Sequence, residues 1–357
     1  MNIVFAIPSL GFGGAERVVS ILASEFANKN RVTIILTSGK NNVVYKLHQN
    51  VEIYTLRNNT SNIKKWLEFR KQCKKLKADI VIAFMDAIGI IASIFLVFTN
   101  IPVICSERND PSESSRKLNI SYRILKNIST NLIKGYVFQS DGARAAYPIK
   151  CQKKSSIILN PIDSSCIPLR DDNTIKRRIV NVGRLHTQKN QKLLINAFAK
   201  SLFFKNGFTL HIYGSGPEKD NLMSMIMELN LENKVFLEGN QNDILEKIKN
   251  SSLFVLTSNY EGLPNSLMEA MAIGIPCIST DCSPGGARML IKADESNGIL
   301  VPCNDEEKLV EKLDILYSNP DLLNTIGKNA KKIINESDVK KIATEWKTFI
   351  EDVCSDR

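Results

Sequence analysis

The sequence contains no hydrophobic run long enough to cross a membrane. Its longest apolar stretch, from Ala87 to Phe98, has twelve residues, whereas a spanning helix needs about 20. The opening residues, MNIVFAIPSL, have no basic segment before the apolar one and lead straight into a glycine-rich loop, so they are predicted to form a strand rather than a signal peptide. We therefore expect a cytoplasmic protein that meets a membrane only from its inner face.

Signatures of metal centres and disulfide frameworks are also missing. The chain has eight cysteines but no Cys-x-x-Cys pair, and its three histidines form no cluster. Cys105 and Cys277 lie inside apolar runs, which is typical of buried, reduced thiols. No Asp-x-Asp sequence occurs anywhere. We expect neither a bound metal nor a cofactor.

Charge is distributed unevenly along the chain. Residues 1–165 contain 23 Lys and Arg against 11 Asp and Glu, a net +12, while residues 166–357 contain 24 against 26, a net −2. Much of the excess lies in 62–77 and 114–134, and in the second segment Ile124 and Ile128 share helical spacing. A basic amphipathic helix suits an anionic membrane surface, although an apolar stripe facing the core beneath solvated lysines gives the same pattern. No aromatic–basic interleaving points to nucleic acid.

Short apolar runs alternate with amphipathic stretches throughout, which predicts an α/β fold with parallel sheets. A polar segment at 160–176 interrupts this rhythm and is predicted to link two Rossmann-like domains, residues 1–165 and 166–337. The last helix, within 338–357, is expected to pack back on the first domain. Ligands of such sheets bind at the carboxyl ends of the strands, which we expect to face an interdomain cleft. The predicted strands are 2–7, 32–36, 51–55, 79–84, 102–105, 135–139, 156–159, 178–182, 208–213, 234–237, 253–257, 276–279 and 299–301.

A glycine-rich loop, SLGFGGAER, follows the first predicted strand. Gly13 and Gly14 allow a tight turn and a close approach to a ligand, and the helix after them directs its first amides toward whatever lies there. The spacing is not that of a dinucleotide fingerprint, and no acidic residue closes the second strand, so a dinucleotide fold is disfavoured. A plain tight turn remains the alternative.

A second loop, GRLHTQKN at 183–190, follows the first strand of the second domain. Arg184 and Lys189 are five residues apart in a strand-to-helix turn, so both cations can converge near the start of the next helix. A diphosphate needs such cations, because charge develops on it as a glycosyl–oxygen bond breaks. Two solvated surface cations are the simpler explanation.

The third segment, SNYEGLPNSLMEA at 258–270, carries two carboxylates around a glycine–proline turn. Pro264 marks a helix start, so Glu261 lies in the loop and Glu269 about one turn into the helix. Amides at that start face an anion well, and carboxylates accept hydrogen bonds from neighbouring sugar hydroxyls. An ordinary solvated helix start is the alternative.

These segments, together with the turn YGSGP at 213–217, resemble the family-4 glycosyltransferases of the GT-B fold over nearly the whole chain. The similarity is closest to bacterial enzymes that extend lipid-linked oligosaccharides for O-antigen, lipopolysaccharide, capsule or protein glycosylation. The resemblance implies that Arg184 and Lys189 hold the donor diphosphate, Glu269 the ribose hydroxyls and Glu261 the transferred hexose. Other donor-binding positions implied by the resemblance are Gly13, Gly14, Gly214, Gly216, Gly262, Leu263, Pro264, Asn265 and Ser266.

One loop departs from the family's pattern. After the strand that ends at Cys105, relatives often carry a histidine in a Ser-Glu-His sequence, whereas this chain reads Ser-Glu-Arg with Glu107 and Arg108. Arginine cannot act as a base, because guanidinium does not lose its proton in proteins. Both residues stay candidates for the catalytic site, with Arg108 steadying a departing phosphate or an acceptor diphosphate.

The resemblance implies a retaining hexosyltransferase. It would move a hexose or N-acetylhexosamine from a nucleotide sugar, of the UDP type, to a polyprenyl-pyrophosphate-linked glycan, with the protein bound peripherally to an anionic membrane. Two alternatives remain open at this stage. A nucleotide-sugar epimerase would bind a similar donor without an acceptor, and a non-catalytic nucleotide-sugar-binding protein would use the same residues for affinity alone.

Overall fold

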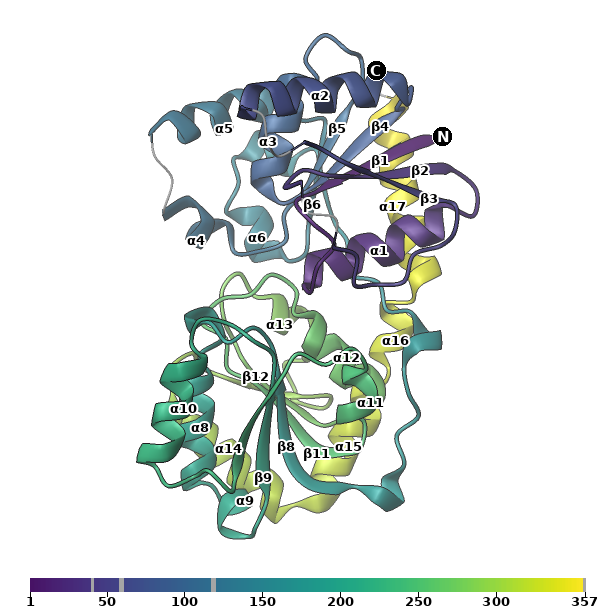
Figure 1. Cartoon of the computed structure of the whole chain (residues 1–357). Coiled ribbons are helices and arrows are strands. Elements are labelled where there is room, and N and C mark those ends of the chain that lie inside the picture. The colour runs from purple at the N-terminus through teal and green to yellow at the C-terminus, as the bar shows by residue number, and fades with distance from the viewer. Residues whose placement is uncertain (40–41, 58–60, 117–119, 356–357) are drawn as a thin grey trace. The chain divides into compact units, whose positions relative to one another are not determined.

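The computed structural model describes residues 1–39, 42–57, 61–116 and 120–355. Its internal contacts divide the chain into two compact units, one formed by Met1–Asp163 with Ser337–Arg357 and the other by Ser164–Glu336 (Figure 1). Unit 1 therefore contains both ends of the chain. Among the described residues, no helix has the length and apolar character needed to cross a bilayer.

Unit 1 is built on a seven-stranded sheet with the strand order β3-β2-β1-β4-β5-β6-β7. Every neighbouring pair is parallel, as the alternation of strands and helices predicts. The order reverses between β1 and β4, which is the switch point where open α/β sheets bind ligands. The strands are β1 (Asn2–Ile7), β2 (Arg31–Leu36), β3 (Val51–Thr55), β4 (Ile80–Phe84), β5 (Val103–Ser106), β6 (Gly135–Phe138) and β7 (Ser155–Ile157).

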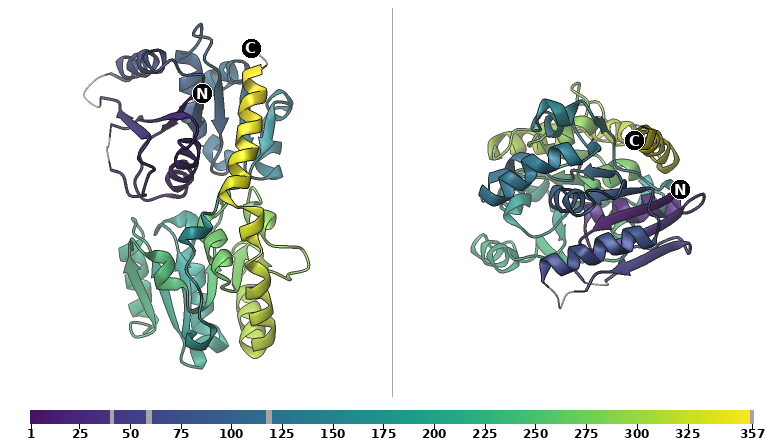
Figure 2. Two further views of the ribbon diagram at one scale, coloured as in Figure 1. Left: turned by 90° about the vertical axis from the view of Figure 1, so that its right-hand side faces the viewer. Right: turned by 90° about the horizontal axis from the view of Figure 1, so that it is seen from above.

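Successive residues of the central strands face opposite sides of this sheet, and both sides are apolar because helices cover both. Phe5 of β1 packs with α1 (Gly14–Phe26) and α17 (Val339–Ser355) in one cluster, and Val4 packs with α2 (Asn62–Lys75) and α3 (Asp86–Phe95) in another. The C-terminal helix α17 thus lies against the unit that carries the N-terminus (Figure 2), where its Trp346 is fully buried.

Four more of the described helices belong to unit 1, of which α6 and α7 contact β6 and β7, and α5 contacts α3. They are α4 (Pro111–Arg116), α5 (Ile120–Leu132), α6 (Asp141–Ala145) and α7 (Ile149–Gln152). The sequence pattern predicts helical structure over 114–131, and the structure describes α4 up to Arg116 and α5 from Ile120 onward. Residues 117–119, which fall within the predicted helix, lie outside the described residues.

Unit 2 repeats the same topology with six parallel strands in the order β10-β9-β8-β11-β12-β13. The switch point falls between β8 and β11. The strands are β8 (Lys176–Val182), β9 (Thr209–Tyr213), β10 (Val235–Gly239), β11 (Ser251–Leu256), β12 (Cys277–Thr280) and β13 (Ile299–Val301). The fold predicted from the sequence, two Rossmann-like domains with parallel sheets, is confirmed.

Helices flank the second sheet as well. One apolar cluster joins the strands to α8, α9, α10, α14 and α15, while α12 contacts β11, α15 and α16. Their bounds are α8 (Gln191–Lys200), α9 (Leu202–Lys205), α10 (Lys219–Glu228), α11 (Ile244–Ile248), α12 (Asn265–Ile273), α13 (Gly286–Leu290), α14 (Glu306–Ser318), α15 (Pro320–Ala330) and α16 (Ile333–Glu336). Three short 3₁₀ helices complete the described elements: η1 (Ser164–Cys166), η2 (Asp172–Thr174) and η3 (Thr187–Lys189).

Candidate active site

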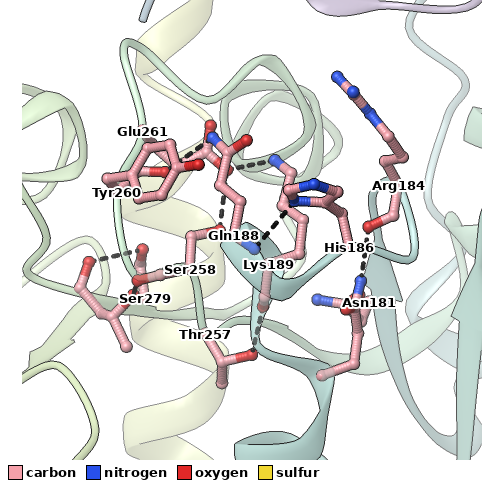
Figure 3. Close-up of polar contacts among 12 residues, drawn as sticks. Asn181, Arg184, His186, Gln188, Lys189, Thr257, Ser258, Tyr260, Glu261 and Ser279 are labelled. Carbon is pink, nitrogen blue, oxygen red and sulfur yellow. Dashed lines mark hydrogen bonds and ion pairs between the residues drawn. The ribbon is translucent and has the colours of Figure 1, made fainter. Parts of the chain in front are cut away.

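An ion pair between Lys189 and Glu261 stands at the switch point of unit 2. Lys189 ends η3 after β8, and Glu261 lies in the loop after β11, so adjacent strands deliver the two side chains to one edge of the sheet. The Lys189 Nζ donates to Glu261 Oε1, and Ser258 Oγ donates to the same oxygen at 2.8 Å. The side chains are only 16% and 10% exposed, so solvent screens this pair weakly. Figure 3 shows the two side chains directed at each other.

Hydrogen bonds fasten the two loops that carry this pair. The amide of Asn259 donates to the Gln188 carbonyl at 2.8 Å, and Gln188 Nε2 donates to the Tyr260 carbonyl at 2.9 Å. The Thr257 hydroxyl reaches the Lys189 carbonyl at 3.1 Å (Figure 3). These hydrogen bonds fix the positions of the two loops, and therefore of Lys189 and Glu261. Binding and catalysis require side chains that are positioned in this way.

Glycines allow backbone segments to approach closely around these loops. A Cβ at Gly214, whose φ of +138° already disfavours other residues, would overlap the Gly183 carbonyl oxygen, and a Cβ at Gly216 would overlap that of Leu185. The YGSGP turn therefore packs directly against the loop that holds Arg184 and Lys189. The structure gives these two glycines a packing role, and their contact with a nucleotide stays a prediction.

Helix α12 begins beside Glu261. Pro264 is its N-cap, and the half-buried Asn265 and Ser266 are its first residues. Glu269 lies in the second turn and is also half-buried. First-turn amides of a helix favour an anion, so the start of α12 suits a phosphate group.

Arg184 stands apart from the ion pair. Its side chain is exposed and extends away from Lys189 and Glu261 (Figure 3), while its carbonyl accepts a hydrogen bond from Gln191 Nε2 at 3.0 Å. The convergence of both cations on a diphosphate, expected from their spacing, stays a prediction. A long exposed side chain can swing toward a ligand without disturbing the fold.

Gly13 and Gly14 are at the start of α1 in unit 1. The Tyr45 hydroxyl donates to the Gly13 carbonyl at 3.1 Å and accepts from the Gly13 amide at 3.3 Å, and Arg17 lies over the Tyr45 ring. Gly14 is exposed and is the first residue of α1. The loop thus lies at the carboxyl end of β1, one of the two strands at the switch point of its sheet.

Glu107 is a buried carboxyl group at the end of β5. Its Oε1 accepts the amides of Arg108 and Asn109 at 2.9 and 3.1 Å, and its Oε2 accepts the Tyr147 hydroxyl at 2.8 Å. Burial, together with the nearby charge of Asp86, raises its pKa from 4.5 to about 7. A carboxyl group with such a pKa can hold or release a proton near neutral pH.

This shift makes stability depend on pH. The folded protein keeps the Glu107 proton to a higher pH than the unfolded chain does, so its contribution is fully present below 4.5 and is lost as the pH rises through about 7. At about 1.4 kcal/mol per pKa unit, the loss reaches up to about 3 kcal/mol. We expect the melting temperature of the wild type to fall more between pH 5 and pH 8 than that of Glu107→Gln. Identical pH profiles would contradict the assigned shift.

Arg108 packs inside unit 1. Its guanidinium lies 4.3 Å from the centre of the Phe84 ring and 5.8 Å from that of Trp346, and Nη1 donates to Asn160 Oδ1 at 2.6 Å. Nε and Nη2 are buried and have no hydrogen-bond partner among the residues that the structure describes. Burial lowers the pKa of this guanidinium to about 9. These contacts join the 106–110 loop to α17, and the predicted role of Arg108 toward a phosphate stays a prediction.

Sequence reasoning missed several residues of these networks. Ser258 follows a buried strand and precedes Glu261 by three residues, a position from which its place in the site could have been predicted. The buried Asp86 binds Lys126 of α5 at 2.8 Å, and Lys126 in turn lies over the Tyr147 ring. No local pattern marks Tyr147, because only packing between β6 and α6 brings it to Glu107.

Comparison with known proteins identifies the family of this chain. Residues 170–333 match the family model described as glycosyl transferases group 1. A Campylobacter jejuni protein named N-acetylgalactosamine-N,N'-diacetylbacillosaminyl-diphospho-undecaprenol 4-alpha-N-acetylgalactosaminyltransferase is 30% identical, over 95% of this chain and 96% of the relative. The chain therefore belongs to the group 1 glycosyl transferases, and it is an enzyme that transfers a glycosyl group.

Further relatives agree over the full length. A second Campylobacter jejuni enzyme, an alpha-1,4-N-acetyl-D-galactosaminyltransferase named for an undecaprenol-linked substrate, is 28% identical over 99% of both chains. Among solved structures, the Anabaena protein HepE in complex with UDP-glucose superposes with a TM-score of 0.85 at 20% identity, covering 100% of both chains. At that identity the likeness concerns the fold.

Proposed function

We propose that this enzyme transfers a hexose or N-acetylhexosamine, with retention of configuration, from a UDP-sugar to a polyprenyl-diphosphate-linked glycan. The observation that carries the proposal is the Lys189–Glu261 pair beside the start of α12, at the switch point of unit 2. The names of the Campylobacter relatives, which include undecaprenol-linked acceptors, and the UDP-glucose bound to the Anabaena protein support it. The product would belong to a bacterial surface glycan of the O-antigen or lipopolysaccharide type.

In this proposal, unit 2 holds the donor. Lys189 and Arg184 neutralise the diphosphate together with the backbone of Gly262, Leu263, Pro264, Asn265 and Ser266. Glu269 accepts the ribose hydroxyls. Glu261 accepts hydroxyls of the transferred sugar, and its existing pair with Lys189 means that an arriving diphosphate competes for the ammonium group. Catalysis then consists of positioning and charge stabilisation.

In this proposal retention needs no covalent intermediate. Glu261 Oε1 accepts hydrogen bonds from the Lys189 ammonium and the Ser258 hydroxyl, and this carboxylate is assigned to hydroxyls of the transferred sugar rather than to attack on its anomeric carbon. The leaving diphosphate would accept the proton of the acceptor hydroxyl on the same face of the sugar.

Unit 1 would hold the acceptor. Glu107 lies at the carboxyl end of β5 and Gly13–Gly14 at that of β1, so both face the ligand-binding edge of the first sheet. A Glu107 with a pKa of about 7 can exchange a proton there. Arg108 would stabilise the 106–110 loop through its contact with Phe84.

The outer face of unit 1 would meet the membrane. Helix α3 packs against both α2 and α5, and the three lie on one side of the unit (Figure 1). Ile124, Leu125 and Ile128 of α5 are exposed, which supports an outward-facing apolar stripe. The exposed apolar residues of this layer are Ile63, Leu67, Phe98, Ile124, Leu125 and Ile128.

Helix α2 carries exposed basic side chains as well as apolar ones. Lys64, Lys71, Lys74 and Lys75 of α2 are exposed, whereas Lys126 of α5 is engaged with Asp86. Arg70 donates to the carbonyls of Phe95 and Val97 at 2.6 and 2.7 Å, which joins α2 to the turn that presents Phe98, 93% exposed. Exposed apolar and cationic side chains on one helix suit an anionic lipid surface.

We therefore expect peripheral binding to anionic vesicles that weakens with salt. Each lysine contributes about 1 kcal/mol near such a surface, so replacing five with glutamate should abolish co-sedimentation and lower activity on a lipid-linked acceptor. The variant carries glutamate at Lys64, Lys65, Lys71, Lys74 and Lys75. A control variant changes the charge by the same amount in unit 2. It carries glutamate at Lys205, Lys247, Lys328, Lys331 and Lys332. Equal binding of the two variants to anionic vesicles would contradict this membrane face. So would binding of the wild type to neutral vesicles as strong as its binding to anionic ones.

The transfer itself is tested with a donor panel. Purified protein is incubated with UDP- and other nucleotide-linked hexoses and N-acetylhexosamines, with and without a polyprenyl-diphosphate-linked glycan, and release of nucleoside diphosphate is followed. Rapid release that requires the lipid-linked acceptor, with an α-linked product from an α-linked donor by NMR, is the expected result. Interconversion of donor sugars without an acceptor, or an inverted linkage, would refute the proposal.

A further inference from the structure

Two cysteine residues lie side by side at the ends of neighbouring strands in unit 2. Strands β12 and β13 are parallel with Thr280 opposite Val301, and the pairing continues because the Asp281 amide donates to the Val301 carbonyl at 2.8 Å. Two residues beyond that pair are Cys282 and Cys303. Paired strands are about 4.8 Å apart, which lies within the Cα separation of about 4.4–6.8 Å that a disulfide requires.

The two thiols lie close enough to perturb each other's pKa, but they differ in access. Cys303 Sγ lies 3.8 Å from the Ser258 carbonyl oxygen, to which it donates. Cys282 is 2% exposed, whereas Cys303 is half-buried and reachable. The hydrogen bond from Cys282 lowers the pKa of Cys303, and the same bond, with burial, raises the pKa of Cys282. Cys303 is therefore the thiol that attacks first.

Each cysteine is also connected, directly or through the next residue, to the loop that carries Glu261. The carbonyl of Ser283, next to Cys282, accepts the Glu261 amide at 2.9 Å. Further along the same segment, Gly286 touches the Gly262 carbonyl so closely that no Cβ fits. On the other side, the Ser258 carbonyl contacted by Cys303 belongs to the residue whose hydroxyl binds Glu261.

We propose that Cys282 and Cys303 form a reversible disulfide that disables the donor site. Its effect on donor binding and transfer rests on the proposed function, whereas the bond itself does not. The oxidant is a small-molecule disulfide. The Cys303 thiolate attacks one of its sulfurs and releases one small thiol, and the Cys282 thiolate then attacks the mixed disulfide at Cys303 and releases the second. Two protein thiols are oxidised, one small disulfide is reduced to two thiols, and both protein protons leave.

Closing this bond moves the supports of Glu261. The two sulfurs must approach to about 2.05 Å, and Cys303 loses the S–H that it donates to the Ser258 carbonyl. Displacing the 258–262 loop also displaces the start of α12, because the chain between them is short. A shift of about 1 Å in such a site costs about 100-fold in rate.

The test titrates the full-length protein with glutathione disulfide and then with dithiothreitol. We expect tandem mass spectrometry after alkylation to find Cys282 linked to Cys303, and UDP affinity and transfer to fall at least tenfold, with full recovery on reduction. Cys303→Ser should keep its activity when oxidant is added, whereas Cys166→Ser, which removes an exposed thiol elsewhere, should respond as the wild type does.

Three results would overturn the proposed disulfide switch. They are the absence of a link between these two cysteines, unchanged UDP affinity in the linked protein, and an equal loss of UDP affinity on oxidation in Cys303→Ser and in the wild type. Absence of transfer in reduced wild-type protein counts against the proposed function instead. In that case the switch is still judged by whether the linked form binds UDP at least tenfold more weakly than the reduced form.

Discussion

Lys189→Ala should lower the rate of sugar transfer by about 100- to 1,000-fold, the usual cost of removing one group that stabilises developing charge in a transition state. The change also leaves the Glu261 carboxylate buried at 8% exposure without its cation, which destabilises the folded protein. The melting temperature of unit 2 should therefore fall together with activity. Turnover is measured by UDP release and folding by calorimetry.

Two further variants separate these effects. Arg184→Ala removes an exposed side chain outside the ion pair, so it should reduce transfer by a similar factor while leaving the melting temperature unchanged. The double variant Lys189→Met with Glu261→Gln should recover stability, because no unpaired charge remains, but should not recover transfer. Near wild-type turnover in either single variant would remove that residue from the diphosphate site.

Glu261→Gln should slow transfer by about 100-fold while UDP binds with unchanged or higher affinity. The amide cannot hold the ammonium of Lys189 as an ion pair, so that cation becomes available to the diphosphate without competition. The rate falls because the variant binds the transferred sugar less well. A carboxylate that accepts hydrogen bonds from sugar hydroxyls contributes more to binding than a neutral amide does. Kd is measured by calorimetry with UDP alone and the rate with the complete donor.

The matched control is Glu269→Gln on α12. Its assigned partner is the ribose, which UDP and the UDP-sugar share, so this variant should weaken UDP binding about tenfold, as loss of a charge-assisted hydrogen bond does. If the two variants weaken UDP equally, the separate roles of the two carboxylates are wrong.

Most of the fold could be predicted from the sequence because its signals are local. Apolar runs such as those around Phe5 and Val180 mark strands that are buried on both faces, and the thirteen predicted strands correspond to β1–β13 with shifts of one or two residues at many ends. The predicted helical segment 114–131 has other outer bounds than the described helices, since α4 begins at Pro111 and α5 ends at Leu132, because an amphipathic pattern does not by itself mark where a helix begins and ends.

The sequence by itself determined which loops carry the candidate site, since parallel strands place their carboxyl ends at one edge and the glycines, cations and carboxylates follow those ends. Only the tertiary structure decided which groups meet. Lys189 binds Glu261 from 72 residues away, Arg108 is covered by Trp346 of the last helix, and Cys282 meets Cys303 through the register of β12 and β13. These contacts depend on strand order and register, which are set by packing over the whole sheet rather than by neighbouring residues.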